Sequence, residues 1–162
     1  MFALGIDPGL SRCGYGAVRG RGSSLEVVAF GHLTTPVEAP LAERLAALWL
    51  DLEELLDDLR PDVVVVERVL FQVNARTAMS VGQASGLALA AAARRSCPVV
   101  QYSPNEVKLA VAGYGSATKE QVQSMVQVLL GLDEAPRPAD RADALALAIT
   151  HLSGAGLQAA SR

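Results

Sequence analysis

The sequence contains no long apolar run, although 51% of its 162 residues are hydrophobic. A membrane-spanning helix needs about 20 consecutive apolar residues. The longest apolar stretches here are short or interrupted by charge, so we expect no membrane span. The first residues, Met1–Ile6, carry no basic side chain and lead to no cleavage site. We therefore expect no signal peptide.

Cysteine is also scarce, since the chain has only Cys13 and Cys97. Two cysteines at this spacing provide neither a disulfide framework nor a zinc-binding motif. We interpret both as small, buried apolar residues rather than catalytic thiols. Together with the missing signal peptide, this composition predicts a cytoplasmic protein.

Basic side chains are fewer than acidic ones, and the formal net charge is −3. The distribution is more informative than the sum. Residues 41–60 hold six acidic against two basic side chains, whereas residues 68–119 hold six basic side chains against Glu106 alone. Such asymmetry permits a face that binds a polyanion on an acidic protein. It does not establish one, because scattered basic residues are usually solvated surface.

The length fits one domain, and the sequence shows neither an internal repeat nor a linker between domains. We expect residues 1–153 to form that domain and residues 154–162 to form a flexible tail. Alternation and β-branched runs predict strands, and apolar side chains at helical spacing predict helices. The predicted strands are 2–6, 14–18, 25–32, 63–66 and 99–102. The predicted helices are 41–59, 74–95, two that begin at capping boxes after Ser103 and Thr118, and 140–152.

This order predicts an α/β fold with a mixed five-stranded sheet and helices on both faces. The first three strands are joined by short loops, so they should be antiparallel. A helical crossover should place the strand 63–66 parallel to the first strand. Asp7 and Glu67 would then leave the sheet side by side, at the edge where open α/β sheets place their ligand sites.

A second pair of acids, Asp140 and Asp143, lies on one face at the start of the last predicted helix. That helix is so apolar that it should be buried. If it packs near the two strand ends, four carboxylates converge and need cations or protons. An all-oxygen site suits Mg²⁺ or Mn²⁺, and two ions would form the clamp used for phosphoryl transfer. Taken singly, each acid is more often a turn former, a strand-end charge or a helix cap.

Four segments in order resemble the motifs of the RuvC family of Holliday junction resolvases, and the resemblance spans nearly the whole chain. They are Leu4-Gly5-Ile6-Asp7-Pro8-Gly9 with Gly14-Tyr15-Gly16; Val66-Glu67 with Asn74-Ala75; Val107-Lys108 with Gly113 to Ala117, Lys119 and Gln121 to Gln123; and Ala139-Asp140-Arg141-Ala142-Asp143-Ala144-Leu145-Ala146.

The resemblance implies an RNase H-like fold and an endonuclease that nicks two strands of a four-way DNA junction symmetrically during recombination and repair. It implies a homodimer with two Mg²⁺ ions per subunit, for which Mn²⁺ would substitute, and partnership with the RuvA–RuvB branch-migration complex. By motif position, Asp7, Glu67, Asp140 and Asp143 are the catalytic metal ligands, and Lys108 and Lys119 serve DNA and the active site. We expect hydrolysis without a covalent intermediate, with Asp7 bridging both ions.

The sequence departs from the family three residues after the glutamate, where an aromatic residue is usual. This position is Leu70, and Phe71 follows it. Either side chain is therefore a candidate for the contact with unpaired bases, while Phe71 is equally readily a core or loop residue. Arg76, in the basic segment, is a further candidate DNA contact.

Small residues recur at three- and four-residue spacing in the helix 74–95, namely Ala75, Ala78, Gly82, Ser85, Gly86 and Ala90. Such a stripe more often packs against the protein's own sheet. A junction, however, offers two strands related by approximate two-fold symmetry, and a C₂ dimer would present two equivalent sites to them. With the resemblance, we predict a dimer interface on this helix.

Three other functions fit parts of the pattern. A pre-ribosomal RNA processing factor of the same fold has similar but looser motifs, and its substrate would be structured RNA. An actin-like or sugar-kinase ATPase would explain Asp7-Pro8-Gly9-Leu10-Ser11, which resembles a phosphate-binding hairpin, but that fold needs two such domains. A junction-binding protein without catalysis would not need four acids in these places.

Overall fold

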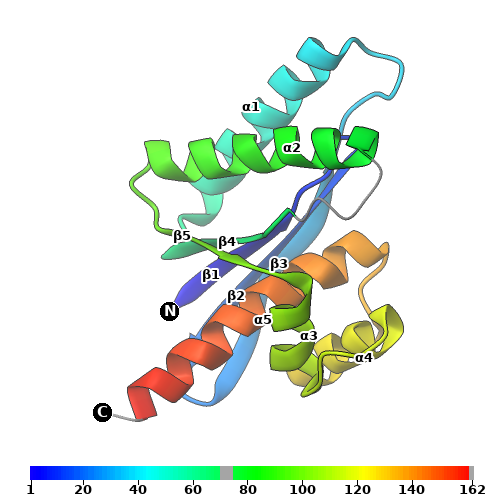
Figure 1. Ribbon diagram of the computed structural model, residues 1–162. Helices are drawn as coiled ribbons and strands as arrows, with labels where there is room; N and C mark the ends of the chain where they lie inside the picture. The colour runs from blue at the N-terminus through cyan, green and yellow to red at the C-terminus, as the bar shows by residue number, and fades with distance from the viewer. Residues whose placement is uncertain (70–74, 161–162) are drawn as a thin grey trace.

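The computed structural model describes the backbone of residues 1–69 and 75–160, and the side chains of residues 1–69 and 77–154. A mixed five-stranded sheet runs through its centre (Figure 1), in the order β3-β2-β1-β4-β5. The strands are β1 (Phe2–Asp7), β2 (Arg12–Arg21), β3 (Ser24–Thr34), β4 (Val63–Glu67) and β5 (Val99–Tyr102).

The strand pairing agrees with the prediction. β1, β2 and β3 are antiparallel neighbours, whereas β1 pairs in parallel with β4, and β4 with β5. The first hairpin is tighter than expected, because β2 runs to Arg21 and β3 begins at Ser24. Gly22 has φ +62°. A residue without Cβ adopts this left-handed conformation at little cost, so two residues suffice for the turn.

In the described residues five helices flank the sheet: α1 (Leu41–Leu59), α2 (Ala75–Arg94), α3 (Pro104–Ala112), α4 (Lys119–Leu130) and α5 (Ala139–Ala160). In Figure 1, α1 and α2 cover one face, while α5 crosses the other with α3 and α4 beside it. Both predicted capping boxes are confirmed, with Ser103 bonding to Glu106 and Thr118 to Gln121.

Helix α5 is longer than predicted, since it continues past Leu152 to Ala160. Residues 153–160 contain no proline to stop the helix, and their alanines and Leu157 favour it, whereas Gly154 and Gly156 oppose it. The predicted domain of residues 1–153 therefore ends within a helix. The expected flexibility of residues 154–162 stays a prediction.

Each face of the sheet has its own apolar core, and β1 contributes to both. Phe2, Leu4 and Ile6 pack with α1 and α2. Ala3 lies in the other core with residues of α3, α4 and α5. Because successive strand residues point to opposite faces, Asp7 lies on the same side as Ala3, which is the α5 side.

Helix α5 lies unusually close to the sheet, and glycines make this possible. A Cβ at Gly5 would collide with the carbonyl oxygen of Ala144, and one at Gly14 would collide with that of Asp140. A Cβ at Gly16 would also come too close to Leu145, by a smaller margin. With these three positions free of side chains, the backbone of α5 rests on β1 and β2, and its first turn reaches the end of β1.

Helix α2 faces the core with a different set of small residues from the one highlighted in the sequence. Ala84, Ala88 and Ala91 are fully buried, and Ser85 is only 4% exposed. Ser85 therefore packs inside the subunit, and including it in an outward stripe was wrong. Gly86 and Ala90 are exposed and Gly82 is half-buried, so they lie on the outer side of the helix.

The structure also bears on the expectations that both cysteines are buried and that no segment spans a membrane. Cys13 is buried, whereas Cys97 is only half-buried, and both are free. In residues 1–69 and 75–160, no helix combines the length and apolar character that crossing a bilayer requires.

Candidate active site

Two acids stand at the carboxyl ends of neighbouring parallel strands. The last paired residues of β1 and β4 are Ile6 and Val66, so Asp7 and Glu67 emerge next to one another. Val65 belongs to the core on the α5 side, and Glu67, two residues later, points to that same side. Alternation along both strands thus aims the two carboxylates at the space beside α5.

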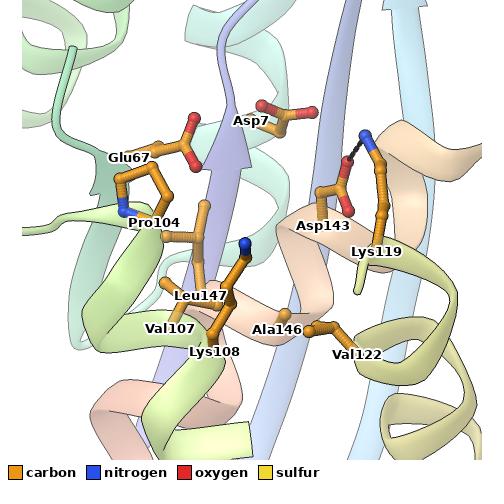
Figure 2. A pocket seen from close by; sticks show the side chains of 10 residues that line it. All are labelled: Asp7, Glu67, Pro104, Val107, Lys108, Lys119, Val122, Asp143, Ala146 and Leu147. Atoms are coloured by element: carbon orange, nitrogen blue, oxygen red, sulfur yellow. Dashed lines mark ion pairs between the residues drawn. The ribbon is translucent and has the colours of Figure 1, made fainter. Parts of the chain in front are cut away.

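The acids of α5 divide between two surroundings. Asp143 faces the same space as Asp7 and Glu67, and Figure 2 shows the three carboxylates arriving from α5, β1 and β4. Asp140 does not line this space. It pairs instead with Arg12 at the start of β2, with 3.1 Å between Arg12 Nε and Asp140 Oδ2.

The three acids open onto a cleft of about 320 Å³. Its walls come from α3, α4 and α5, and its floor is apolar. The lining residues are Asp7, Glu67, Pro104, Val107, Lys108, Lys119, Val122, Asp143, Ala146 and Leu147. A pocket with an apolar floor and a few convergent charged groups is the usual form of a binding or catalytic site.

The pKa values of the acids in the cleft are raised. Burial, followed by the charges of Asp143, Glu67 and Asp140, raises the pKa of Asp7 to about 8. Burial likewise raises the pKa of Glu67, with Asp143 adding to the effect. These directions show that the carboxylates repel one another at close range in a poorly solvated place, which favours cations or protons there.

Lys119 supplies one compensating charge. Its Nζ lies 2.6 Å from Asp143 Oδ2, as the dashed line in Figure 2 marks. Burial alone lowers the pKa of Lys119, but its hydrogen bond to Asp143 and the surrounding acids raise it overall. For Asp143, burial outweighs the lysine, so its pKa is still raised.

The donor set suits a hard divalent ion, because every titrating ligand in the cleft is a carboxylate. The side chains do not, however, already form a closed cage. Among residues whose side chains are described, no group of three histidine, cysteine, aspartate or glutamate residues could hold one ion as placed. The fit therefore rests on chemistry and charge, namely several mutually repelling oxygen ligands from three elements.

The candidate DNA contacts fall into two groups. Lys108 and Lys119 both line the cleft, and Lys108 rises from α3 toward the carboxylates in Figure 2. Leu70 and Phe71 lie outside the described residues. Arg76 lies in α2, but its side chain is also outside the described part.

Sequence reasoning missed Arg12, because nothing local connects it with Asp140 near the other end of the chain. A signal was nevertheless present in the strand pattern. Arg12 stands two and four residues before Gly14 and Gly16, which pack under α5. Alternation therefore puts its side chain on the face that α5 covers.

Comparison with known proteins agrees with this site. Residues 3–151 match the family model described as "Crossover junction endodeoxyribonuclease RuvC". The chain is 48% identical to the protein of that name from Moorella thermoacetica over 153 residues, covering 94% of this chain and 92% of the relative. It is 52% identical to the one from Leifsonia xyli over 161 residues, covering 98% and 76%.

Solved structures give the same result. The RuvC structure of Thermus thermophilus superposes with a TM-score of 0.88 at 40% identity, covering 98% of this chain and 97% of the other. The T. thermophilus protein in complex with a Holliday junction substrate gives a TM-score of 0.91, with 98% and 96% covered. The RNase H-like fold predicted from the sequence is thereby confirmed, and the chain belongs to the RuvC family of crossover junction endodeoxyribonucleases.

Proposed function

We propose that this chain cuts two strands of a Holliday junction symmetrically by hydrolysis at the cleft between β1, β4 and α5. Its membership in a family of crossover junction endodeoxyribonucleases makes it a nuclease of DNA recombination and repair. The observation that carries the proposal is the convergence of Asp7, Glu67 and Asp143 in one cleft. Burial, and after it the repulsion among these acids, raises the pKa of Asp7, and both effects favour a cation at this site.

The metal dependence belongs to the family, and we propose Mg²⁺ as the ion, two per subunit, with Mn²⁺ as a substitute. Asp7, Glu67 and Asp143 would hold them, with Asp140 as a fourth ligand from the adjoining turn of α5. When bound, such ions activate water and stabilise the leaving oxygen of an in-line displacement. Asp7 is suited to a shared ligand position, because it stands between the other two acids at the end of the central strand.

The remaining cleft residues fit a phosphodiester substrate. Lys108 brings an ammonium group to the mouth without an acidic partner in the described contacts. Lys119 is held by Asp143, which fixes its position and reduces the negative charge that DNA must approach. The apolar floor of Val107, Val122 and Leu147 keeps water sparse beneath the acids, which strengthens every charge interaction above it.

We also propose a homodimer formed through the outer side of α2. Met79 on this helix is 65% exposed, and its spacing from Gly82 and Gly86 puts it on the same side of the helix. Apart from adjacent residues and the nearby backbone of α2 itself, no atom of the described chain lies within 4 Å of a Cβ built at Gly82 or Gly86. The surface is therefore open and lets another backbone come close, and a C₂ pair would offer two equivalent sites to a junction.

Two further parts of the proposal concern the cell. The RuvA–RuvB branch-migration complex is the proposed partner of the dimer on the junction, and the cytoplasm is the proposed compartment. Both rest on the family and on the composition of the chain. The unit of residues 1–153 is proposed as the nuclease domain.

A cleavage assay tests the function. The purified chain is incubated with a labelled four-way DNA junction, a linear duplex of the same sequence and a structured RNA, each with Mg²⁺, Mn²⁺ or EDTA. We expect paired cuts in the junction alone and only with a divalent ion. Cutting of the RNA in preference to the junction would contradict the proposal, and so would equal cutting of junction and duplex.

A further inference from the structure

Arg12 occupies a place next to the cleft that the proposed mechanism does not use. It opens β2, just beyond the turn that follows Asp7, and its Nε contacts Asp140 Oδ2 at 3.1 Å. The Arg12 side chain is 49% exposed and that of Asp140 is 30% exposed. An ion pair so open to water contributes at most about 1 kcal/mol to folding. Stability therefore does not explain the arrangement.

The segment that carries Arg12 is braced from two sides, so the position of the guanidinium is built into the fold. Arg44 of α1 donates through Nε to Thr35 Oγ1 at 3.0 Å and through Nη2 to Ser11 Oγ at 2.8 Å. The Thr35 hydroxyl in turn donates to the backbone carbonyl of Leu10. These bonds hold the residues immediately before Arg12 against α1 and the end of β3.

A second cation stands close to this place. Arg141, the residue after Asp140, donates through Nε to His32 Nδ1 at 3.1 Å. His32 pairs with Gly14 across β2 and β3, so it lies on the face that α5 covers. Two arginines thus meet at the first turn of α5, where Arg12 of β2 contacts Asp140 and Arg141 contacts His32 of β3.

We propose that Arg12 binds a phosphate of the junction backbone on the β2 side of the cleft, and that Asp140 controls its availability. This rests on the proposed function, because the phosphate belongs to the DNA that the cleft would cut. A guanidinium presents five donors in a planar fork that fits phosphate as well as carboxylate. Asp140 and the phosphate therefore compete for the same group.

The competition has a measurable consequence. When DNA binds the wild-type chain in the absence of divalent ions, the new ion pair between Arg12 and phosphate forms at the expense of the ion pair with Asp140, and the two effects on affinity largely cancel. If Asp140 loses its charge, the guanidinium is free beforehand and its full attraction for phosphate appears in the affinity for DNA. The two residues should therefore act on DNA binding in a strongly non-additive way.

A double-mutant cycle tests this without any cutting. Affinity for the four-way junction is measured in EDTA over a salt series for the wild type, Arg12→Gln, Asp140→Asn and the double variant. We expect Arg12→Gln to weaken binding about fivefold or more in the Asp140→Asn chain, and less than about twofold in the wild type. When Arg12→Gln is added to the Asp140→Asn chain, the dependence of junction affinity on salt should also become weaker, by the amount expected for about one lost phosphate contact.

Two further variants sharpen the cycle. Arg12→Lys in the Asp140→Asn chain should keep the salt dependence but recover only part of the affinity, because an ammonium lacks the fork. Arg21→Gln is the matched control, since Arg21 lies at the other end of β2 and pairs with Glu26 at 3.4 Å. It should leave junction affinity unchanged in both backgrounds.

An equal loss for Arg12→Gln in both backgrounds would overturn the proposal, because a long-range charge effect is additive. Absence of any loss in the Asp140→Asn chain would overturn it as well. Failure of the proposed function has a different signature. In that case the wild-type chain would bind the junction no better than linear duplex, whatever stands at residue 12.

Discussion

The raised pKa of Asp7 predicts that the catalytic centre destabilises the fold in the absence of divalent ions. An aspartate ordinarily titrates near 3.8, and Asp7 titrates at about 8. Between these values the folded chain holds a proton that the unfolded chain has released. The free energy of unfolding therefore falls as pH rises through this window. We expect Asp7→Asn, which cannot ionise, to remove that loss.

The size of the effect follows from the same values. The interval from 3.8 to about 8 corresponds to at most about 6 kcal/mol for an isolated group. Neighbouring acids share the repulsion and water relaxes around them, so about 2 kcal/mol is a sounder expectation. For a chain of 162 residues this raises the melting temperature by roughly 4–8 °C.

The assay is thermal unfolding in EDTA at pH 8.5 and at about pH 3.5, followed by circular dichroism. Asp7→Asn should melt higher than the wild type at pH 8.5, and the difference should largely vanish at the lower pH, which lies below the ordinary aspartate pKa of 3.8, because Asp7 then carries its proton in both the folded and the unfolded chain. Asp58→Asn, at an exposed acid of α1, is the control and should change little at either pH. A variant that melts no higher at pH 8.5, or equally higher at both pH values, would refute the reasoning.

Four further outcomes follow from the site and the surface. Glu67→Gln should abolish cutting but keep junction binding, and a near wild-type cutting rate would contradict its role as a ligand. Lys119→Ala should slow cutting about 10²-fold, as loss of a charge at a reaction centre does, and unchanged activity across a salt series would exclude that role. Phe71→Ala should impair cutting of intact junctions more than of partly single-stranded ones, whereas an equal loss would indicate a structural residue. Gly86→Leu should keep the fold, since the position is open, but shift sedimentation toward monomer; an unchanged dimer would place the interface elsewhere.

The strand ends were predictable because they depend on short-range rules. Alternation fixes the direction of Asp7, and four β-branched residues before Glu67 mark a strand buried on both faces. Parallel neighbours then have to end at the same edge. Placing Asp143 beside these two acids required only that the apolar helix carrying it be buried against the sheet, and α5 is buried in this way.

The contacts that the sequence did not reveal share a physical cause, which is that they join distant segments of the chain. Asp140 sits three residues before Asp143, yet it turns to Arg12 because β2 begins beside the first turn of α5. Ser85 looked like part of an outward stripe, but the direction of α2 over the sheet buries it. Periodicity reveals which residues of a helix share a side, and only the packing partner decides which side faces inward.

Helix α5 approaches the sheet so closely at Gly5, Gly14 and Gly16 that no space is left for a side chain between the helix and the strands that position the acids. A single added methyl group at Gly5 would have to lift the helix, and lifting it would withdraw Asp143 from Asp7. Loss of cutting at these three positions therefore reports a displacement of the α5 backbone, because an added Cβ would overlap it. Random mutagenesis scored only by cleavage would rank these glycines with the carboxylates, although they carry no side chain.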